Sequence, residues 1–282
     1  IFTIFPRFIY TSLTIRYLCC RTSTDSGGIM KLDFAAISDP GDRSYQQDLA
    51  VMLFPAMIFG VIDGMGGHKN GDKAAQLVLK EYEYLQHEDK ASMEPLLAAA
   101  KRAHAAVYAI NKDKRGCERA GAVGTIGWIN QRYCRAHIVH IGDSRVYLFG
   151  QKGLQQISVD DTPLAGMNEK DRLNHEKKNQ IYDAYGLHEH ANFSTYEIWF
   201  NPGETLMFCT DGLSDLLLPI NIQKALARND SALEIARDLL QMAKCLPRPC
   251  KDNITIVVVR AIDQPSDTQN SLGTNPTCCP IE

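Results

Sequence analysis

Apolar and polar positions alternate in two rhythms along this chain, one typical of strands and one typical of helices. Short apolar runs rich in β-branched residues predict strands at residues 32–37, 49–54, 57–62, 122–130, 133–141, 144–149, 206–209 and 254–261. Apolar residues at helical spacing predict helices at residues 72–85, 93–112, 222–228 and 231–244. The strands therefore come in groups that are separated by two helix pairs. This order favours an α+β domain with antiparallel sheets and helix pairs packed outside them, because a parallel sheet would need regular strand–helix alternation.

Two segments follow neither rhythm. Residues 160–195 are polar and irregular, and we expect only a short helix there, at residues 168–177. Residues 263–282 are rich in Ser, Thr, Asn and Pro and have no apolar period, so we expect a disordered tail. The folded domain is thus expected at residues 30–262.

The first 29 residues also differ from the rest. They are apolar, but Pro6, Arg7 and Arg16 interrupt the apolar stretch, which is too short to span a membrane. The order of a signal peptide is missing as well. Met30 looks like a natural start, so we expect residues 1–29 to be an extension that is non-native or disordered. A membrane-proximal anchor is the alternative.

Composition and charge argue against several function classes. The net charge is −3, whereas a nucleic-acid binder would need a basic stripe. The nine cysteines are odd in number and form neither CxxC pairs nor the Cys/His spacing of a zinc site, which argues against a disulfide scaffold. We therefore expect a cytoplasmic protein with no nucleic-acid or membrane partner.

Four aspartates stand in sharp glycine or asparagine settings beside strand-like runs: Asp63, Asp143, Asp211 and Asp252. A carboxylate at a strand end is held by a rigid scaffold. Several converging carboxylates repel one another unless cations lie between them. Sites made only of oxygen atoms suit Mg or Mn rather than Zn. The first hypothesis is therefore a pair of metal ions, bridged by carboxylates, that carries out hydrolysis.

Each aspartate also has a structural explanation. Asp63 and Gly64 form one of the commonest turn pairs. Asp211 could cap a short helix, Asp143 could close a turn between two strands, and Asp252 could be an ordinary loop carboxylate. Only the four motifs taken together favour the metal hypothesis over these alternatives.

The ordered set of motifs resembles the signatures of the metal-dependent protein phosphatases (the PPM, or protein phosphatase type 2C, family), especially its bacterial branch. The motifs are DGMGGH at 63–68, GDSR at 142–145, DGLSD at 211–215 and DNIT at 252–255. The resemblance implies a four-layer αββα sandwich, with two antiparallel sheets flanked by helix pairs. It also implies hydrolysis of phosphoserine and phosphothreonine on proteins by a metal-bridged water.

The resemblance assigns the metal ligands of two Mn or Mg ions per subunit. Asp63 would bridge both ions, with the Gly64 carbonyl as a further ligand. Asp211 and Asp252 would hold the first ion. Asp143 matches the position that binds a third, weaker ion in bacterial relatives, and a solvated role or a share in that third site are both open for the nearby Asp215.

The resemblance also assigns substrate contacts to the turn that precedes the second strand. Arg43 stands at the offset of the family's phosphate-gripping arginine, which would make it a catalytic and substrate-binding residue; a solvated turn arginine is the alternative. Asp48 matches the catalytic residue that hydrogen-bonds metal-bound water. Gln47 departs from the pattern, because the usual residue is Glu, and this removes a negative charge near the second ion.

Two further features have weaker assignments. Eukaryotic members of the family have a histidine at the position that Met65 occupies here. His68 is expected to be a packing residue rather than a general acid. Residues 160–195 match the family's variable flap and resemble flaps of phosphatases encoded with bacterial type VI secretion systems. His175, Lys177 and Lys178 of this flap are candidates for substrate contacts, and a solvated face is the simpler expectation.

The expected partners follow from the resemblance. They are a phosphorylated protein substrate and a cognate serine/threonine kinase pathway, and a monomer is expected. Two alternatives remain open from the sequence: a catalytically weak regulatory module that binds phosphoprotein, towards which only Gln47 points, and a two-metal hydrolase of small phosphoesters.

Overall fold

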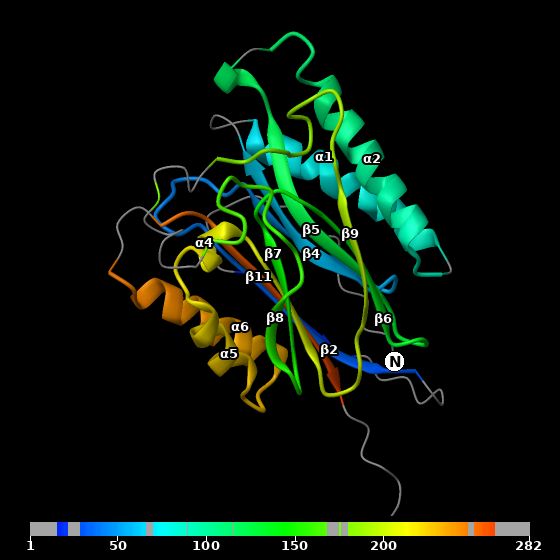
Figure 1. The fold of residues 1–282 in the computed structure, drawn as a ribbon, viewed down its shortest axis with the longest axis vertical. Coiled ribbons are helices and arrows are strands. Elements are labelled where there is room, and N and C mark those ends of the chain that lie inside the picture. The colour runs from blue at the N-terminus through cyan, green and yellow to red at the C-terminus, as the bar shows by residue number, and fades with distance from the viewer. Residues whose placement is uncertain are drawn as a thin grey trace, which may run out of the picture.

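The computed structural model describes residues 16–21, 29–65, 70–88, 90–114, 116–167, 175, 180–247 and 251–262. Two antiparallel sheets pack face to face, and one helix pair covers the outer face of each sheet (Figure 1). This confirms the predicted α+β, four-layer αββα sandwich.

Within the part of the chain that the structure describes, the sheets contain six and five strands. The first sheet has the order β1 (Arg16–Arg21), β2 (Lys31–Asp39), β11 (Ile254–Ile262), β10 (Thr205–Cys209), β7 (Arg145–Gly150) and β8 (Gly153–Gln156). The second has the order β3 (Asp48–Leu53), β4 (Ile58–Met65), β5 (Gly121–Asn130), β6 (Arg135–Ile141) and β9 (Ser194–Trp199). Every paired neighbour is antiparallel.

Helices cover both sheets, as Figure 1 shows. The pair α1 (Gly71–Glu83) and α2 (Met93–Ala109) packs on the five-stranded sheet, and the pair α5 (Pro219–Leu226) and α6 (Ala232–Cys245) packs on the six-stranded sheet. Shorter elements complete the described part of the chain: η1 (Tyr84–His87), η2 (Gly116–Glu118) and the four-residue α4 (Asp211–Ser214). Among the described residues, no helix is both long and apolar enough to cross a bilayer.

Strand periodicity explains why the layers stack in this way. Side chains alternate between the two faces of a strand. In β4, Ile58 and Ile62 point into the core beneath α1 and α2, whereas Phe59 and Val61 point into the core between the sheets. Burial of both faces is why this run reads as continuously apolar.

The structure adds three strands that the sequence did not predict, namely β1, β8 and β9. β1 pairs with β2 over six residues, so residues 16–21 belong to a sheet although the whole segment 1–29 was expected to lie outside the fold. The expected helix at 168–177 lies outside the described residues apart from His175, and the expected tail at 263–282 lies wholly outside them.

Candidate active site

All four motifs meet at one end of the sandwich. Asp48 begins β3 and lies directly across from Asp63 of β4 in the antiparallel register. Asp211 begins α4 immediately after β10, and Asp252 stands just before β11, which is the neighbour of β10. Both sheets thus contribute carboxylates to the same end of the sandwich. The metal hypothesis requires such a convergence of carboxylates.

Asp63 and Gly64 do not form a turn. Both residues belong to β4 and pair with β5, which overturns the structural alternative. A Cβ atom on Gly64 would lie 2.2 Å from the carbonyl oxygen of Gly71, the first residue of α1. Glycine is therefore required here for close packing of the strand against the helix, and the role of the Gly64 carbonyl as a metal ligand stays a prediction.

The carboxylates at this end repel one another strongly. Burial raises the pKa of Asp63 well above its usual value; the carboxylates that raise it further, largest first, are those of Asp48, Asp211, Asp143 and Asp252. Burial, and then Asp143, likewise raise the pKa of Asp211. Burial also raises the pKa of Asp48 to about 7. So many converging carboxylates favour a bound cation, because a cation relieves the repulsion.

Asp48 is fixed by the opposite sheet. Its Oδ2 accepts a hydrogen bond of 2.8 Å from Thr210 Oγ1, and Thr210 Oγ1 in turn accepts one of 3.0 Å from the backbone of Thr255. Thr210 was not singled out from the sequence. Its partner Asp48 is 162 positions away, so no local pattern could have revealed the contact.

Asp143 lies in the connection between β6 and β7, 6% exposed. Burial, followed by the charges of Asp160 and Asp215, raises its pKa to about 7. Gly142 before it has φ +98°, a left-handed conformation that favours glycine. Asp143 and Asp215 therefore face the same acidic cluster. The third metal site expected at Asp143 stays a prediction, and whether Asp215 shares it stays open.

Arg43 is directed at Asp252 of the acidic cluster and remains partly exposed to solvent. Its Nη2 donates to Asp252 Oδ2 at 2.7 Å, and its Nη1 donates to the hydroxyl of Tyr45 at 3.2 Å. The two charged side chains remain 43% and 45% exposed, so the guanidinium can still reach a ligand at the mouth of the site. This placement favours the phosphate-binding assignment over a solvated turn arginine.

The residues present fit divalent ions. Two buried carboxylate oxygens, Asp48 Oδ1 and Asp211 Oδ1, accept no hydrogen bond from the described part of the chain. A buried oxygen without a partner is costly. A hard cation would satisfy Asp211 Oδ1, and water bound to such a cation would satisfy Asp48 Oδ1. Within the same described residues, no three His, Cys or acidic side chains are grouped closely enough to hold an ion by themselves. Water would have to complete the shell of a bound ion, as is usual for Mg.

The family assignment comes from a sequence comparison. Residues 48–246 match the profile of the family described as protein phosphatase 2C. The matched stretch is well over half of the chain and contains the motifs at 63, 142 and 211. The chain belongs to the protein phosphatase 2C family.

Two bacterial serine/threonine phosphatases resemble this chain in sequence. The serine/threonine protein phosphatase PstP of Mycobacterium tuberculosis is 31% identical over 241 residues, which make up 82% of this chain and 45% of PstP. The serine/threonine phosphatase stp of Listeria monocytogenes is 25% identical over 213 residues, 71% of this chain and 82% of stp. These relatives confirm the predicted bacterial branch, and the chain spans about half the length of PstP.

Two solved structures share the fold of this chain. The catalytic domain of PstP in complex with two manganese ions superimposes with a TM-score of 0.72 at 30% identity, covering 83% of this chain and 100% of that domain. PppA, described as a key regulatory component of the type VI secretion system in Pseudomonas aeruginosa, gives a TM-score of 0.69 at 25% identity over 82% of this chain and 98% of PppA.

The expected flap is anchored at both ends. At its start, two hydrogen bonds join Asp161 to Gly142. Asp161 N donates to Gly142 O at 2.7 Å, and Gly142 N donates to Asp161 Oδ2 at 2.8 Å. Near its end, the buried Tyr185 hydroxyl lies 2.9 Å from that of Tyr82 on α1. The flap boundaries 160–195 stay a prediction, and His68, Lys177 and Lys178 lie outside the described residues.

A buried ion pair at the start of the flap was missed by the sequence analysis. Arg145 of the GDSR motif is 3% exposed and Asp160 is 6% exposed. The guanidinium donates three hydrogen bonds of 2.6–3.1 Å to this carboxylate. Two signals were available in the sequence: Arg145 stands two residues after a candidate metal ligand, and Asp160 stands at the expected start of the flap. Neither signal indicates that the two residues pair.

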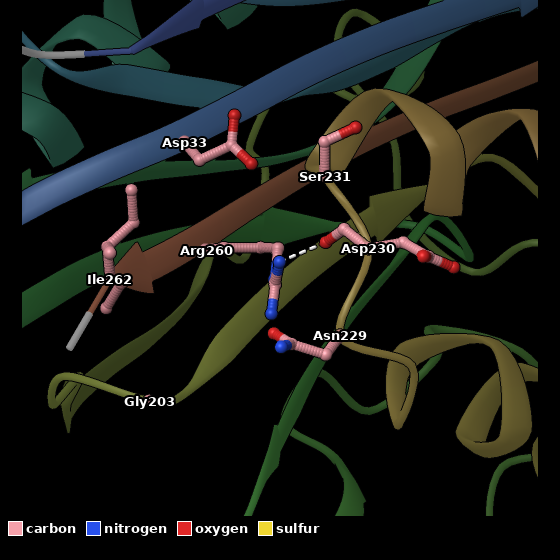
Figure 2. Close-up of a pocket in the computed structure, with 8 residues that line it drawn as sticks. Asp33, Gly203, Asn229, Asp230, Ser231, Arg260 and Ile262 are labelled. Atoms are coloured by element: carbon pink, nitrogen blue, oxygen red, sulfur yellow. Dashed lines mark hydrogen bonds between the residues drawn. The ribbon is translucent and has the colours of Figure 1, made fainter.

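One cavity lies away from this site. It measures about 540 Å³ and is lined by Asp33, Gly203, Asn229, Asp230, Ser231, Arg260, Ala261 and Ile262 (Figure 2). It lies at the far end of β11 from Asp252. Its polar groups serve the fold: Asp33 Oδ2 accepts from the backbone of Ala232 at 2.9 Å at the start of α6, and Arg260 donates to the Asp230 carbonyl.

Proposed function

We propose that this chain hydrolyses phosphoserine and phosphothreonine esters on proteins and that the reaction depends on Mn or Mg. One observation carries the proposal: a guanidinium, that of Arg43, lies at hydrogen-bonding distance from Asp252 at the edge of an acidic cluster built by both sheets. Cation sites next to a partly exposed guanidinium that can donate to phosphate are what phosphoester hydrolysis needs. The serine/threonine phosphatase names of the relatives support the same conclusion.

Each side chain has a defined task in this proposal. The carboxylates of Asp63, Asp211 and Asp252 would hold two ions, and Asp143 would hold a third, weaker one. When bound, such ions lower the pKa of water and neutralise charge on a phosphoryl group. Arg43 binds and orients the phosphate through its planar donors.

Asp48 has a different task, which is to accept a proton or hydrogen bond from attacking water through Oδ1. Its other oxygen is fixed by Thr210, so Oδ1 has a constant direction. Preorganised acceptors of this kind need no rearrangement during the reaction.

The biological setting is proposed more coarsely. A kinase that acts on serine or threonine must supply the phosphoprotein, and we propose a monomer in the cytoplasm. The resemblance of the flap to type VI-associated phosphatases stays a prediction, and the likeness to PppA supports it.

An assay with two substrates separates the proposal from its alternatives. The chain would be given p-nitrophenyl phosphate and a phosphothreonine peptide, each in Mn²⁺ and in EDTA. We expect turnover of both in Mn²⁺ and of neither in EDTA. Turnover of the small ester alone would favour a hydrolase of small phosphoesters. Binding of the peptide without any turnover would favour a regulatory module.

Arg43→Ala should raise KM for the phosphopeptide by about 10- to 100-fold, because a lost charged hydrogen bond costs about 1.5–3 kcal/mol. Mn²⁺ affinity should not fall. It should rise by at most about fivefold, because the exposed pair that competes for Asp252 is worth about 1 kcal/mol or less. Steady-state kinetics and calorimetric Mn²⁺ titration check both effects. Arg102→Ala, which removes an exposed ion-paired arginine on α2, is the control, and equal KM values for the two variants would contradict the assignment.

Gln47→Glu should tighten Mn²⁺ binding a few-fold. Gln47 is 8% exposed, and its Nε2 lies against Gly71, which begins α1. A carboxylate there adds a negative charge near the second ion and also faces the positive end of a helix dipole. Calorimetry at low and high salt measures the gain, which should shrink at high salt if it acts at long range. Gln155→Glu, an equal charge change at an exposed position of β8, should leave Mn²⁺ affinity unchanged. Equal or weaker Mn²⁺ binding by Gln47→Glu would refute the prediction.

A further inference from the structure

The side chain of Asn253 makes three hydrogen bonds to one loop. Asn253 follows Asp252 and is 4% exposed. Its Oδ1 accepts from the backbone of Gln47 at 2.8 Å. Its Nδ2 donates to the carbonyls of Pro40 at 3.0 Å and Tyr45 at 2.9 Å. One buried amide thus joins both ends of the loop that runs from residue 40 to residue 47, here called the arginine loop.

The arginine loop carries the groups that the proposed reaction needs. Arg43 projects from its middle towards Asp252, and Asp48 follows its last residue. The carbonyl of Gln47 also accepts a hydrogen bond of 3.2 Å from Gly64, so the end of the loop is joined to β4 beside Asp63. Any shift of the arginine loop would therefore move a phosphate contact and a carboxylate together.

The two halves of the arginine loop are held differently. The first half lies on the main chain of the segment before Asn253: Asp42 N donates to Lys251 O at 2.9 Å, and Lys251 N donates to Asp42 Oδ2 at 2.8 Å. The returning half is joined to the same segment by the Asn253 side chain and by the exposed Arg43–Asp252 pair. Exposed pairs hold little, so the buried amide is the stronger restraint.

We infer that Asn253 is a positioning residue that fixes Arg43 and Asp48 relative to the metal-binding carboxylates. It acts through the arginine loop and touches no reacting atom. The inference rests on the proposed function for its kinetic consequence, whereas the restraint on the loop follows from the contacts alone.

The chain offers a closely matched control in Asn111. This residue is also 4% exposed, and its side chain also makes three hydrogen bonds to backbone atoms. Its Oδ1 accepts from Ala120 N at 2.7 Å. Its Nδ2 donates to Ala120 O at 2.6 Å and to Gly186 O at 3.1 Å. It holds the connection between α2 and β5 and makes none of these bonds to the arginine loop. Asn111→Ala therefore removes the same chemistry from a different place.

The test compares Asn253→Ala with Asn111→Ala. Because a misplaced contact of about 1 Å can cost up to a hundredfold, we expect Asn253→Ala to raise KM for a phosphothreonine peptide by about five- to tenfold. In an Arg43→Ala background the same change should add less than about twofold, because the contact that it positions is already gone. Asn111→Ala should lower the melting temperature by a similar amount and leave KM unchanged. Additive effects of Asn253→Ala and Arg43→Ala, or equal KM changes in both asparagine variants, would overturn the inference.

Hydrogen–deuterium exchange gives a second readout that does not need turnover. Asn253→Ala should speed exchange of the amides of residues 43–47 more than those of residues 111–120, and Asn111→Ala should do the reverse. If Asn253→Ala does not fold, Asn253→Ser keeps a smaller polar group and should show the same pattern more weakly. Unchanged exchange in the arginine loop would overturn the positioning role. A wild-type chain without turnover would instead overturn the proposed function, and the exchange result would still decide the role of Asn253.

Discussion

Asp63→Asn should reduce Mn²⁺-dependent turnover by at least about a thousandfold, equivalent to about 4 kcal/mol of transition-state stabilisation. The amide keeps the size and the strand position of the side chain but loses the charge with which it would bridge two ions. The same change removes one member of a cluster whose carboxylates raise one another's pKa. Without metal, the variant should therefore melt at or above the temperature of the wild type, because repulsion is relieved.

Kinetics and thermal melting, measured on the same preparations with Mn²⁺ and with EDTA, check both halves of this prediction. Asp113→Asn, an equal charge change at an exposed position after α2, should leave turnover and melting close to those of the wild type. If Asp63→Asn keeps more than a small fraction of wild-type turnover, Asp63 is not the bridging ligand. If it loses turnover and also melts far below the wild type in EDTA, the loss reflects unfolding.

Asp160→Asn should destabilise the fold by about 3–5 kcal/mol, the usual cost of leaving one buried charge without its partner. Arg145 is only 3% exposed and directs three hydrogen bonds at Asp160, so water cannot replace the carboxylate. The neighbouring Asp161 is hydrogen-bonded to Gly142, which precedes Asp143. Loss of the Asp160 charge should therefore also loosen Asp143, a candidate metal ligand.

Denaturant unfolding measures this free energy, and Glu81→Gln is the matched control. Glu81 pairs with Arg102 at 3.0 Å, but the two side chains are 18% and 49% exposed. An exposed pair contributes about 1 kcal/mol or less, so the control should shift stability little. Equal shifts in the two variants would mean that the Arg145–Asp160 pair is not the restraint described.

The layered fold followed from the sequence because periodicity and burial agree along most elements. Both helix pairs and most of the strands were predicted from apolar spacing alone. β9 was not predicted although its sequence STYEIW alternates polar and apolar residues. It borders a long polar segment, and the residues of its exposed face are of the kind expected in a loop. β8 is too short for a period of two to stand out.

The candidate site was predictable only where chemistry is written in a short motif. The four aspartates could be found because each stands beside glycine or asparagine and next to a strand-like run of residues. The restraints on them could not be found, since Thr210 and Asn253 act on residues 162 and 206 positions away. Such contacts depend on the pairing of strands across two sheets, and a single sequence has no local signal for them.

Anomalous scattering from Mn²⁺-soaked crystals is the most direct test of the claim that the acidic cluster is a metal centre. We expect two strong manganese peaks that share the Asp63 carboxylate, with Asp211 and Asp252 beside one of them and a weaker third peak near Asp143. Manganese bound elsewhere on the chain, or no peak at this end of the sandwich at saturating Mn²⁺, would contradict it.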